Sequence, residues 1–178
     1  PHFLFNTLNN IYSMVLLGDK EAAASVLRLS SIMSYMLYEC NGHAVDLNKE
    51  LTLIQDYIEL EKLRYGDRLD LSLEVSGQLN GKIITPLLLL PFVENAFKHG
   101  VSSSEKNSWI RINIQVVDNE LVFMIENSIL SVQETDVPVN SGIGLNNVKK
   151  RLEFLYPGKH QLKITVEDTY LVNLKIQL

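Results

Sequence analysis

The sequence has almost no cysteine and no long apolar run, and both absences limit what the chain can be. Its 178 residues include one cysteine, Cys40, which excludes an internal disulfide and a cysteine-rich metal site and fits a reducing compartment. No stretch approaches the roughly 20 apolar residues that span a bilayer. The densest run, residues 83–93, is short and contains two prolines. We therefore expect any targeting or membrane segment to lie upstream of Pro1.

An excess of positive charge is also missing. Sixteen lysines and arginines stand against 21 acidic residues, which gives a formal net charge of −5. A general nucleic-acid binder needs a basic face to displace counterions from phosphates, so we expect no direct nucleic-acid partner. With 46% hydrophobic and 21% charged residues, the composition is that of a globular protein. The length allows a small helical module plus one compact domain.

The first forty residues show the apolar periodicity of two helices. In the first, over residues 1–17, apolar side chains recur at spacings of four, three and four: Leu4, Leu8, Ile11 and Val15. A second pattern runs to residue 40, and Gly18-Asp19 separates the two, which predicts an antiparallel helical hairpin. Because a hairpin alone buries little apolar surface, we expect it to pair with a second copy in a four-helix bundle. A hairpin packed on its own domain is the alternative.

The rest of the chain combines helical and strand patterns. Helices are predicted over 47–65, 84–99 and 144–156, and alternating strands over 69–75, 109–117, 121–126, 162–166 and 171–176. Strand hairpins interleaved with helices predict an α+β sandwich, in which helices cover one face of a largely antiparallel or mixed sheet. We therefore expect two domains, the hairpin over residues 1–45 and the sandwich over residues 46–178.

Three short segments are candidates for chemistry, and the first lies at the start of the chain. His2 and Asn6 are four residues apart, so they share one helical face beside the apolar stripe. An imidazole in this place is able to accept a phosphoryl group near neutral pH. On its own, such a histidine is more often a solvated surface residue than a functional one.

The second segment, residues 91–100, reads PFVENAFKHG. Helical spacing turns its apolar residues towards the core and leaves four polar residues on the other face: Glu94, Asn95, Lys98 and His99. The side-chain oxygen of Asn95 suits Mg²⁺, which takes few protein ligands together with phosphate oxygens. The Glu94 carboxylate can orient or deprotonate a nucleophile. The alternative is a solvated helix face with an ion pair between Glu94 and Lys98.

The third segment, residues 141–148, reads SGIGLNNV, follows a polar loop and opens a helix. Glycines at a helix start, here Gly142 and Gly144, let backbone N–H groups approach a phosphate closely, and the helix dipole favours the anion. The segment has neither the full Gly-x-Gly-x-x-Gly pattern nor a Walker lysine. A glycine-rich turn that closes a loop is therefore an open alternative.

Taken in this order, the segments resemble the LytS/YehU-type sensor histidine kinases. Residues 1–9, PHFLFNTLN, resemble their phosphoacceptor box, residues 94–100, ENAFKHG, their N box, and residues 142–152, GIGLNNVKKRL, their glycine box. Residues 50–64 resemble the middle segment of the same family. The resemblance covers nearly the whole chain. It implies a dimerising helical hairpin followed by a GHKL (Bergerat-type) ATP-binding α/β sandwich with a mixed sheet.

The resemblance also implies roles for single residues. His2 would be the phosphoacceptor, and Glu94 a catalytic or positioning carboxylate. Asn95 would bind Mg²⁺, and the other residues implied in binding ATP are Lys98, His99, Gly142, Gly144, Leu145 and Asn147. The relatives usually have Asp-x-Gly or Asp-Asn-Gly where the adenine amino group is recognised. The corresponding strand end here is Glu126-Asn127-Ser128, so either Glu126 or Asn127 would accept that hydrogen bond.

One further departure concerns the base. Phe3 follows His2, where several other histidine kinase families have an acidic residue that activates the imidazole. This makes Glu94 the candidate base.

The activity that the resemblance implies is phosphorylation of His2 by ATP, in cis or across a homodimer, followed by transfer to an aspartate of a response regulator. The chain would be a cytoplasmic fragment of a bacterial cell-membrane protein, attached to the membrane only through upstream segments. The alternative function is a catalytically degenerate module that binds nucleotide or a partner and signals by its shape.

Overall fold

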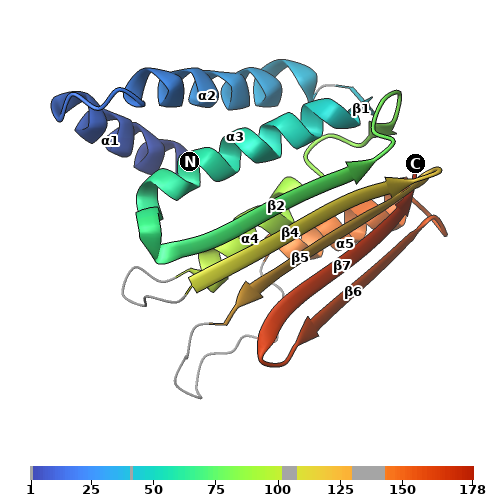
Figure 1. The fold of residues 1–178 in the computed structure, drawn as a ribbon. Coiled ribbons are helices and arrows are strands. Elements are labelled where there is room, and N and C mark those ends of the chain that lie inside the picture. The colour runs from blue at the N-terminus through green and yellow to red at the C-terminus, as the bar shows by residue number, and fades with distance from the viewer. Residues whose placement is uncertain (1, 41, 102–107, 130–142) are drawn as a thin grey trace.

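The structure is a computed structural model that describes residues 2–40, 42–101, 108–129 and 143–178. The helices are α1 (His2–Leu16), α2 (Ala22–Ser34), the π-helix η1 (Tyr35–Glu39), α3 (Leu47–Tyr65), the 3₁₀-helix η2 (Gly66–Arg68), α4 (Leu90–Gly100) and α5 (Ile143–Leu155). The strands are β1 (Val45–Asp46), β2 (Leu69–Gly77), β3 (Ile83–Ile84), β4 (Ser108–Val117), β5 (Glu120–Ser128), β6 (His160–Val166) and β7 (Thr169–Gln177). The α+β architecture predicted from the sequence is confirmed (Figure 1).

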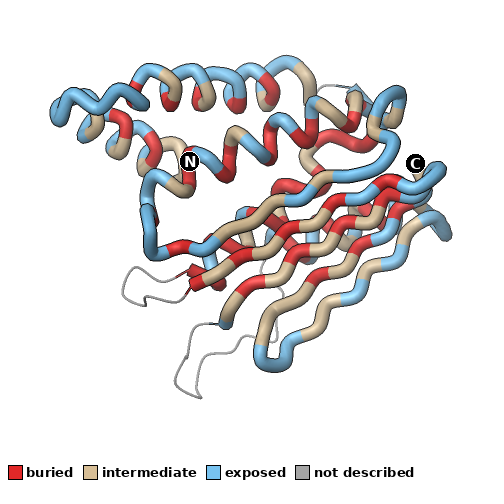
Figure 2. Tube along the Cα trace, viewed as in Figure 1, coloured by how far each residue is buried: buried red, intermediate tan, exposed pale blue. Residues whose placement is uncertain are grey.

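The first two helices form the predicted hairpin, and both of them contact α3 (Figure 1). Ile11, Leu29 and Ile32 are buried and belong to one apolar core together with α3. The hairpin therefore packs against its own chain, as the alternative to the four-helix bundle predicts. Much of its outer surface stays exposed (Figure 2), including the apolar side chains of Leu8 and Val15. The domain boundary at residues 45 and 46 stays a prediction.

The large sheet is mixed and has the strand order β2-β4-β5-β7-β6. Strands β2 and β4 are parallel, and the other neighbouring pairs are antiparallel. Alternate residues of the central strands are buried under the helices, as the pattern of half-buried strands predicts: Ile110, Ile112, Ile114, Leu121, Phe123, Ile125, Val172 and Leu174. Helices α4 and α5 contact each other, and α4 lies on β4 and β5. Figure 1 shows both helices on the same side of the sheet.

The helix predicted over residues 84–99 begins later than expected, and this prediction was wrong at its N-terminal end. Residues 83–84 form β3, which pairs with β1, and α4 begins only at Leu90. The residues between them are held by side chains from distant parts of the chain. Glu50 accepts hydrogen bonds from the backbone N–H groups of Leu87 to Leu89, and Arg151 donates to the carbonyls of residues 86 and 87. Local periodicity cannot reveal such partners.

Across the residues that the structure describes, no helix is both long enough and apolar enough to cross a membrane.

Candidate functional site

The α4 helix presents one polar and one apolar face, as its sequence predicts. Its apolar residues Phe92, Val93, Ala96 and Phe97 are all buried. On the other face, Glu94, Lys98 and His99 are exposed and Asn95 is half-buried. Pro91 occupies the first turn of the helix, where its missing N–H has no helical partner to lose. The four predicted site residues of this segment therefore lie on one surface.

The end of β5 contributes a buried amide next to that helix. Asn127 is only 1% exposed and shares the helix-covered face of the strand with Phe123 and Ile125. Its Nδ2 donates to the carbonyl of Ser128 at 2.8 Å. Its Oδ1 is the one buried side-chain oxygen or nitrogen, among the described residues, that has no hydrogen-bond partner. Buried polar atoms are nearly always paired, so an unpaired acceptor here is suited to a ligand that donates.

Glu126 lies on the opposite face of the same strand, because successive side chains of a strand alternate. Its Oε1 accepts a hydrogen bond from the Thr169 hydroxyl at 2.7 Å. Of the two candidates for adenine recognition, Asn127 thus points towards α4, and Glu126 points to the face of the sheet away from the helices.

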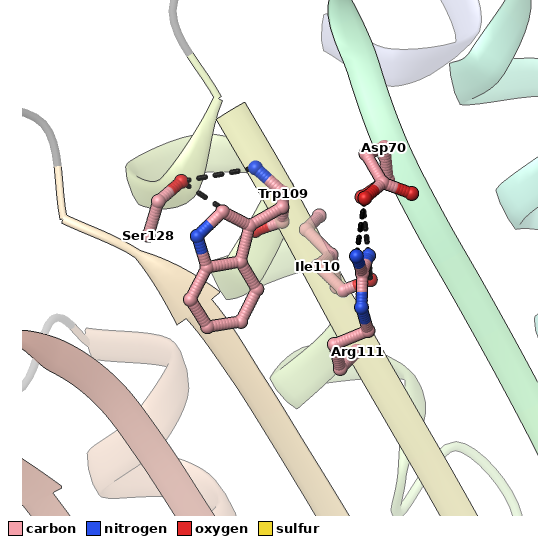
Figure 3. A network of polar contacts seen from close by, with 5 residues as sticks. All are labelled: Asp70, Trp109, Ile110, Arg111 and Ser128. Atoms are coloured by element: carbon pink, nitrogen blue, oxygen red, sulfur yellow. Dashed lines mark hydrogen bonds and ion pairs between the residues drawn. The ribbon is translucent and has the colours of Figure 1, made fainter. Parts of the chain in front are cut away.

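The C-terminal end of α4 is fitted closely to Asn127. A methyl group at Gly100 would lie 2.5 Å from Nδ2 of Asn127, so only glycine fits at this position. The hydroxyl of Ser128 donates to the Gly100 carbonyl at 3.0 Å and accepts from the Trp109 N–H at 3.1 Å. Figure 3 shows this hydroxyl beside the Trp109 backbone. Further along β4, Arg111 is hydrogen-bonded to Asp70 of the neighbouring strand β2. Ser128 therefore joins the ends of α4, β4 and β5.

A tyrosine that the sequence analysis missed lies near both candidate binding residues. Tyr170 pairs with Asn127 across β5 and β7, and its hydroxyl interacts with the side chain of Asn95. Burial raises the pKa of the Tyr170 hydroxyl by more than the interaction with Asn95 lowers it, so the hydroxyl stays protonated near neutral pH. Tyr170 is thus a strand neighbour of Asn127 and interacts with Asn95 of α4. No sequence pattern indicates this placement, because strand register brings residue 170 to residue 127.

Two titratable groups of the polar face have shifted acidities. Packing against neighbouring groups raises the pKa of the Glu94 carboxyl, although the side chain still reaches solvent. Burial, and secondarily the charge of Lys98, lower the pKa of His99. A carboxyl with a raised pKa is a better proton acceptor near neutral pH, and a histidine with a lowered pKa stays neutral there.

The helix of the glycine segment lies beside α4. Within α5, Leu145, Val148 and Leu152 are buried and anchor the helix to the core. Gly144 and Asn147 are exposed near its N-terminus, and nothing lies within 4 Å of the place where a Gly144 side chain would begin. Gly142 lies outside the described residues. The start of α5 therefore offers backbone N–H groups on the same side of the sheet as Asn95.

The start of α1 lies close to the same region. The backbone of His2 begins the helix, and its side chain lies outside the described part of the structure. The next residue, Phe3, stacks on Tyr57 with ring centroids 4.7 Å apart. Tyr57 in turn meets Phe97 of α4 edge-on at 5.9 Å. An aromatic cluster thus joins the residue after the candidate phosphoacceptor to the helix that carries Glu94.

The side chains of this region suit a metal ion that takes most of its coordination from water and a bound phosphate ligand. Among the described residues, no group of three or more histidine, cysteine, aspartate or glutamate side chains is placed to hold a metal ion. Asn95 can offer one amide oxygen, and it lies on the helix that contacts α5, whose N-terminal N–H groups suit an anion. This fits Mg²⁺, which keeps several waters and phosphate oxygens in its coordination shell.

A hollow elsewhere on the molecule contains none of the predicted site residues. Its volume is about 480 Å³, and it lies between Arg28 of α2, the exposed side of α3, and Leu71 and Leu73 of β2. Its walls carry charges of both signs, including Asp56 and Lys62. The unpaired acceptor lies instead beneath α4, and the glycine-opened helix lies beside it, so the chemistry favours that location.

Comparisons with known proteins identify relatives of this chain. A family model described as Histidine kinase matches residues 1–69. The sensor histidine kinase YpdA of Escherichia coli (strain K12) is 32% identical over 164 residues, which cover 88% of this chain and 29% of YpdA. The sensor protein kinase HptS of Staphylococcus aureus (strain USA300) is 31% identical over 174 residues, which cover 92% of this chain and 33% of HptS. The chain thus spans about a third of the length of these relatives.

A solved structure shows the same fold. The histidine kinase domain of the blue-light activated histidine kinase from Erythrobacter litoralis has a TM-score of 0.55 and 16% sequence identity. The match covers 99% of this chain and 94% of that domain. It includes the hairpin as well as the sheet.

Proposed function

Since this chain belongs to the catalytic region of the LytS/YpdA/HptS-type sensor histidine kinases, we propose that it binds Mg-ATP beside α4 and transfers the γ-phosphoryl group to His2. Catalytic domains of this kind generally use ATP. The observation that carries the proposal is the unpaired Oδ1 of Asn127, buried on the same face of the sheet as Asn95 and α5.

The proposal assigns the adenine ring to Asn127. The exocyclic amino group of adenine donates hydrogen bonds, and the Oδ1 of Asn127 accepts without having a partner. Guanine has a carbonyl at the corresponding position and would face the same acceptor unfavourably. Glycine at position 100 leaves room for the Asn127 amide, because any larger residue would displace that side chain.

The triphosphate is assigned to the start of α5 and the polar face of α4. Backbone N–H groups and the dipole at a helix N-terminus favour phosphate, and Gly142, Gly144, Leu145 and Asn147 belong to that end. Asn95 would hold Mg²⁺, which neutralises charge on the phosphate oxygens when it is bound. Lys98 adds a positive charge, and His99, with its lowered pKa, contributes as a neutral hydrogen-bonding group.

The transfer itself needs few protein groups. The bond between the γ-phosphorus and its bridging oxygen breaks, a bond forms between phosphorus and a nitrogen of His2, and ADP leaves. The imidazole proton passes to solvent or to Glu94, whose raised pKa suits a base. In the second step the phosphoryl group moves from His2 to an aspartate carboxylate of a response regulator. YpdA and HptS are sensor kinases, and this partner is the one that such kinases imply.

The proposal includes a homodimer formed through the hairpin, and attachment to a membrane through upstream segments. The exposed apolar side chains of α1 support the dimer. The contact of Phe3 with the α3–α4 cluster is compatible with transfer to the histidine of the same chain.

The direct test is incubation with ATP labelled in the γ-phosphate, using a chain extended upstream of Pro1 so that the first turn of α1 is preceded by residues that can cap it. We expect label on the wild type, because the proposal places both an acceptor and a nucleotide site on this chain. The bound phosphate should be stable to base and labile to acid, as a phosphorus–nitrogen bond is. His2→Ala should remove the label and keep nucleotide binding. Asn95→Ala should reduce both labelling and Mg-dependent binding.

The outcomes separate the two functions considered. Nucleotide binding without any label on the extended wild type would favour a degenerate signalling module. Labelling that persists in His2→Ala would contradict the assignment of the acceptor. A wild type that does not bind Mg-ATP at all would overturn the proposal.

A further inference from the structure

A buried carboxylate lies where the hairpin, α3 and the segment before α4 meet. Glu50 of α3 has no exposed surface, and a carboxylate in such a place needs several donors. Its Oε2 accepts from the Tyr35 hydroxyl at 2.5 Å and from the Leu87 N–H at 2.9 Å. Its Oε1 accepts from the N–H groups of Leu88 and Leu89 at 2.9 and 3.2 Å. One carboxylate therefore bonds both the hairpin and the residues that lead into α4.

The segment before α4 is also held from the side of α5. Arg151 donates to the carbonyls of Pro86 and Leu87 at 2.7 and 3.0 Å. Leu87 has a φ angle of +55°, which is costly for a residue with a branched side chain. Such a conformation persists only where the surroundings fix the backbone. Here Glu50 accepts hydrogen bonds from the N–H groups and Arg151 donates to the carbonyls. A change in either side chain therefore directly alters how this backbone is held.

Tyr35 is the only member of this network on the hairpin, among the described contacts of Glu50. It is the first residue of η1, the π-helix that continues α2, and π-helical turns occur mainly at functional sites. The side chain is 7% exposed. Burial, together with the neighbouring Glu50, raises the pKa of its hydroxyl, which therefore remains a donor. The hydrogen bond from the Tyr35 hydroxyl to Glu50 therefore ties η1 to α3.

We propose that Tyr35 and Glu50 are positioning residues that couple the hairpin to the nucleotide site. The inference rests on the proposed function, because residues 85–89 lead into the helix that carries Glu94 and Asn95. A movement of the hairpin that withdraws the Tyr35 hydroxyl leaves a buried carboxylate with one donor fewer. Glu50 and the N–H groups of Leu87 to Leu89 then rearrange, and the start of α4 moves with them.

The coupling has a thermodynamic consequence that a purely structural role lacks. If the state of η1 changes the affinity of the site for Mg-ATP, then Mg-ATP must change the stability of η1 by the same factor. Binding of nucleotide at α4 therefore stabilises a π-helix on a different element. This effect should disappear when the Tyr35 hydroxyl is removed and the rest of the chain is kept.

The test is amide hydrogen exchange on the 178-residue chain, with and without Mg-ATP, in wild type and Tyr35→Phe. Without nucleotide, we expect Tyr35→Phe to speed the exchange of the amides of residues 87–89 by roughly tenfold, because a hydrogen bond to a charged acceptor contributes about that factor to a local opening. With Mg-ATP, the wild type should show slower exchange over residues 35–39, and Tyr35→Phe should not.

Tyr38→Phe is the matched control. It removes a hydroxyl from the same π-helix, but Tyr38 is 74% exposed, so we expect wild-type exchange at residues 87–89 and a wild-type response to Mg-ATP. Arg151→Lys provides a second comparison, because it loosens residues 86–87 from the α5 side and leaves Tyr35 in place. It should speed exchange in that segment and keep the response of residues 35–39.

Either of two results would overturn the coupling alone: unchanged exchange at residues 87–89 in Tyr35→Phe, or a wild type that binds Mg-ATP without any change at residues 35–39. A wild type with no affinity for Mg-ATP would instead remove the proposed function, and the coupling would fall with it. A separate measurement of Mg-ATP affinity distinguishes these cases.

Discussion

Among single residues, Asn127 shows most directly how the chain can prepare a site at the expense of its own hydrogen bonding. Its Oδ1 is buried without a partner, and an unmade hydrogen bond of this kind costs about 1–3 kcal/mol. Gly100 and Ser128 nevertheless hold the amide in place. A ligand with a donor at this point recovers the missing interaction, so part of the binding free energy is prepared in the folded chain.

Replacing this amide by an apolar side chain of similar size should separate stability from binding. We expect Asn127→Leu to melt within a few degrees of the wild type, because it removes both an unpaired acceptor and the bond to Ser128. Its affinity for ATP should fall roughly tenfold or more, since the adenine amino group would be left unpaired. Its affinity for GTP should change much less. Calorimetric titration with both nucleotides measures the ratio.

Asn173→Leu is the control for this substitution. Asn173 lies on β7 opposite Met124, on the face of the sheet away from the helices, so we expect it to keep the wild-type ratio of ATP to GTP affinity. An Asn127→Leu chain that prefers ATP as strongly as the wild type would contradict the assignment of adenine.

The polar residues of α4 could be predicted from the sequence, but the residues that surround them in the candidate site could not. Glu94 and Asn95 follow from helical periodicity, which is a local property. The choice between Glu126 and Asn127 depends on which face of β5 meets the helices, and this is decided by tertiary packing. Tyr170 is placed by a strand register that joins residues 43 positions apart, so nothing near it in the sequence marks it as part of the site.

The elements of the chain follow its periodic patterns closely, except where distant side chains hold the backbone. Helix α3 begins after Asp46, which caps it by accepting from the Asn48 N–H at 2.8 Å. It ends at Tyr65, before Gly66, which has a positive φ. The start of α4 is different, because Glu50 and Arg151 take the backbone groups that a longer helix would use. The hydrophobic pattern over residues 84–89 would be the same whether or not these residues were helical, so it cannot distinguish the two structures.

The packing of α3 against its neighbours makes the stability of the molecule depend on pH. Glu61 is 7% exposed, and burial raises its pKa. The folded chain therefore holds a proton on Glu61 at pH values where the unfolded chain has released it. The resulting stability is fully present below the ordinary carboxyl pKa and is lost as the pH rises through the folded pKa. We expect Glu61→Gln to weaken this decline in urea unfolding measured across that interval.

Glu59→Gln is a suitable comparison on the same helix. Glu59 is exposed and pairs only at the surface with Lys62, so its replacement should leave the pH dependence as in the wild type. A Glu61→Gln chain whose stability still declines with the wild-type slope would show that other groups are responsible.

For the molecule as a whole, one apolar core joins the hairpin to the sheet and yet leaves the hairpin incompletely covered. Ile11, Leu29 and Ile32 belong to the same core cluster as the strands. On the outside of α1, by contrast, Leu8, Tyr12 and Val15 are each more than half exposed. Apolar residues grouped on one helical face in this way are typical of an interface. A second copy related by twofold symmetry would cover both hairpins at once.

This arrangement predicts a concentration-dependent dimer that a single charge on α1 disrupts. We expect the wild type to sediment as a dimer at high concentration, and Tyr12→Glu to sediment as a monomer, because an unpaired carboxylate would be buried at the interface. The folded monomer should persist, since Tyr12 is 65% exposed and contributes little to the core. Phe154→Glu, at an 83% exposed position of α5, should remain dimeric. A wild type that stays monomeric at every concentration would show that the hairpin packs only on its own domain and forms no dimer interface.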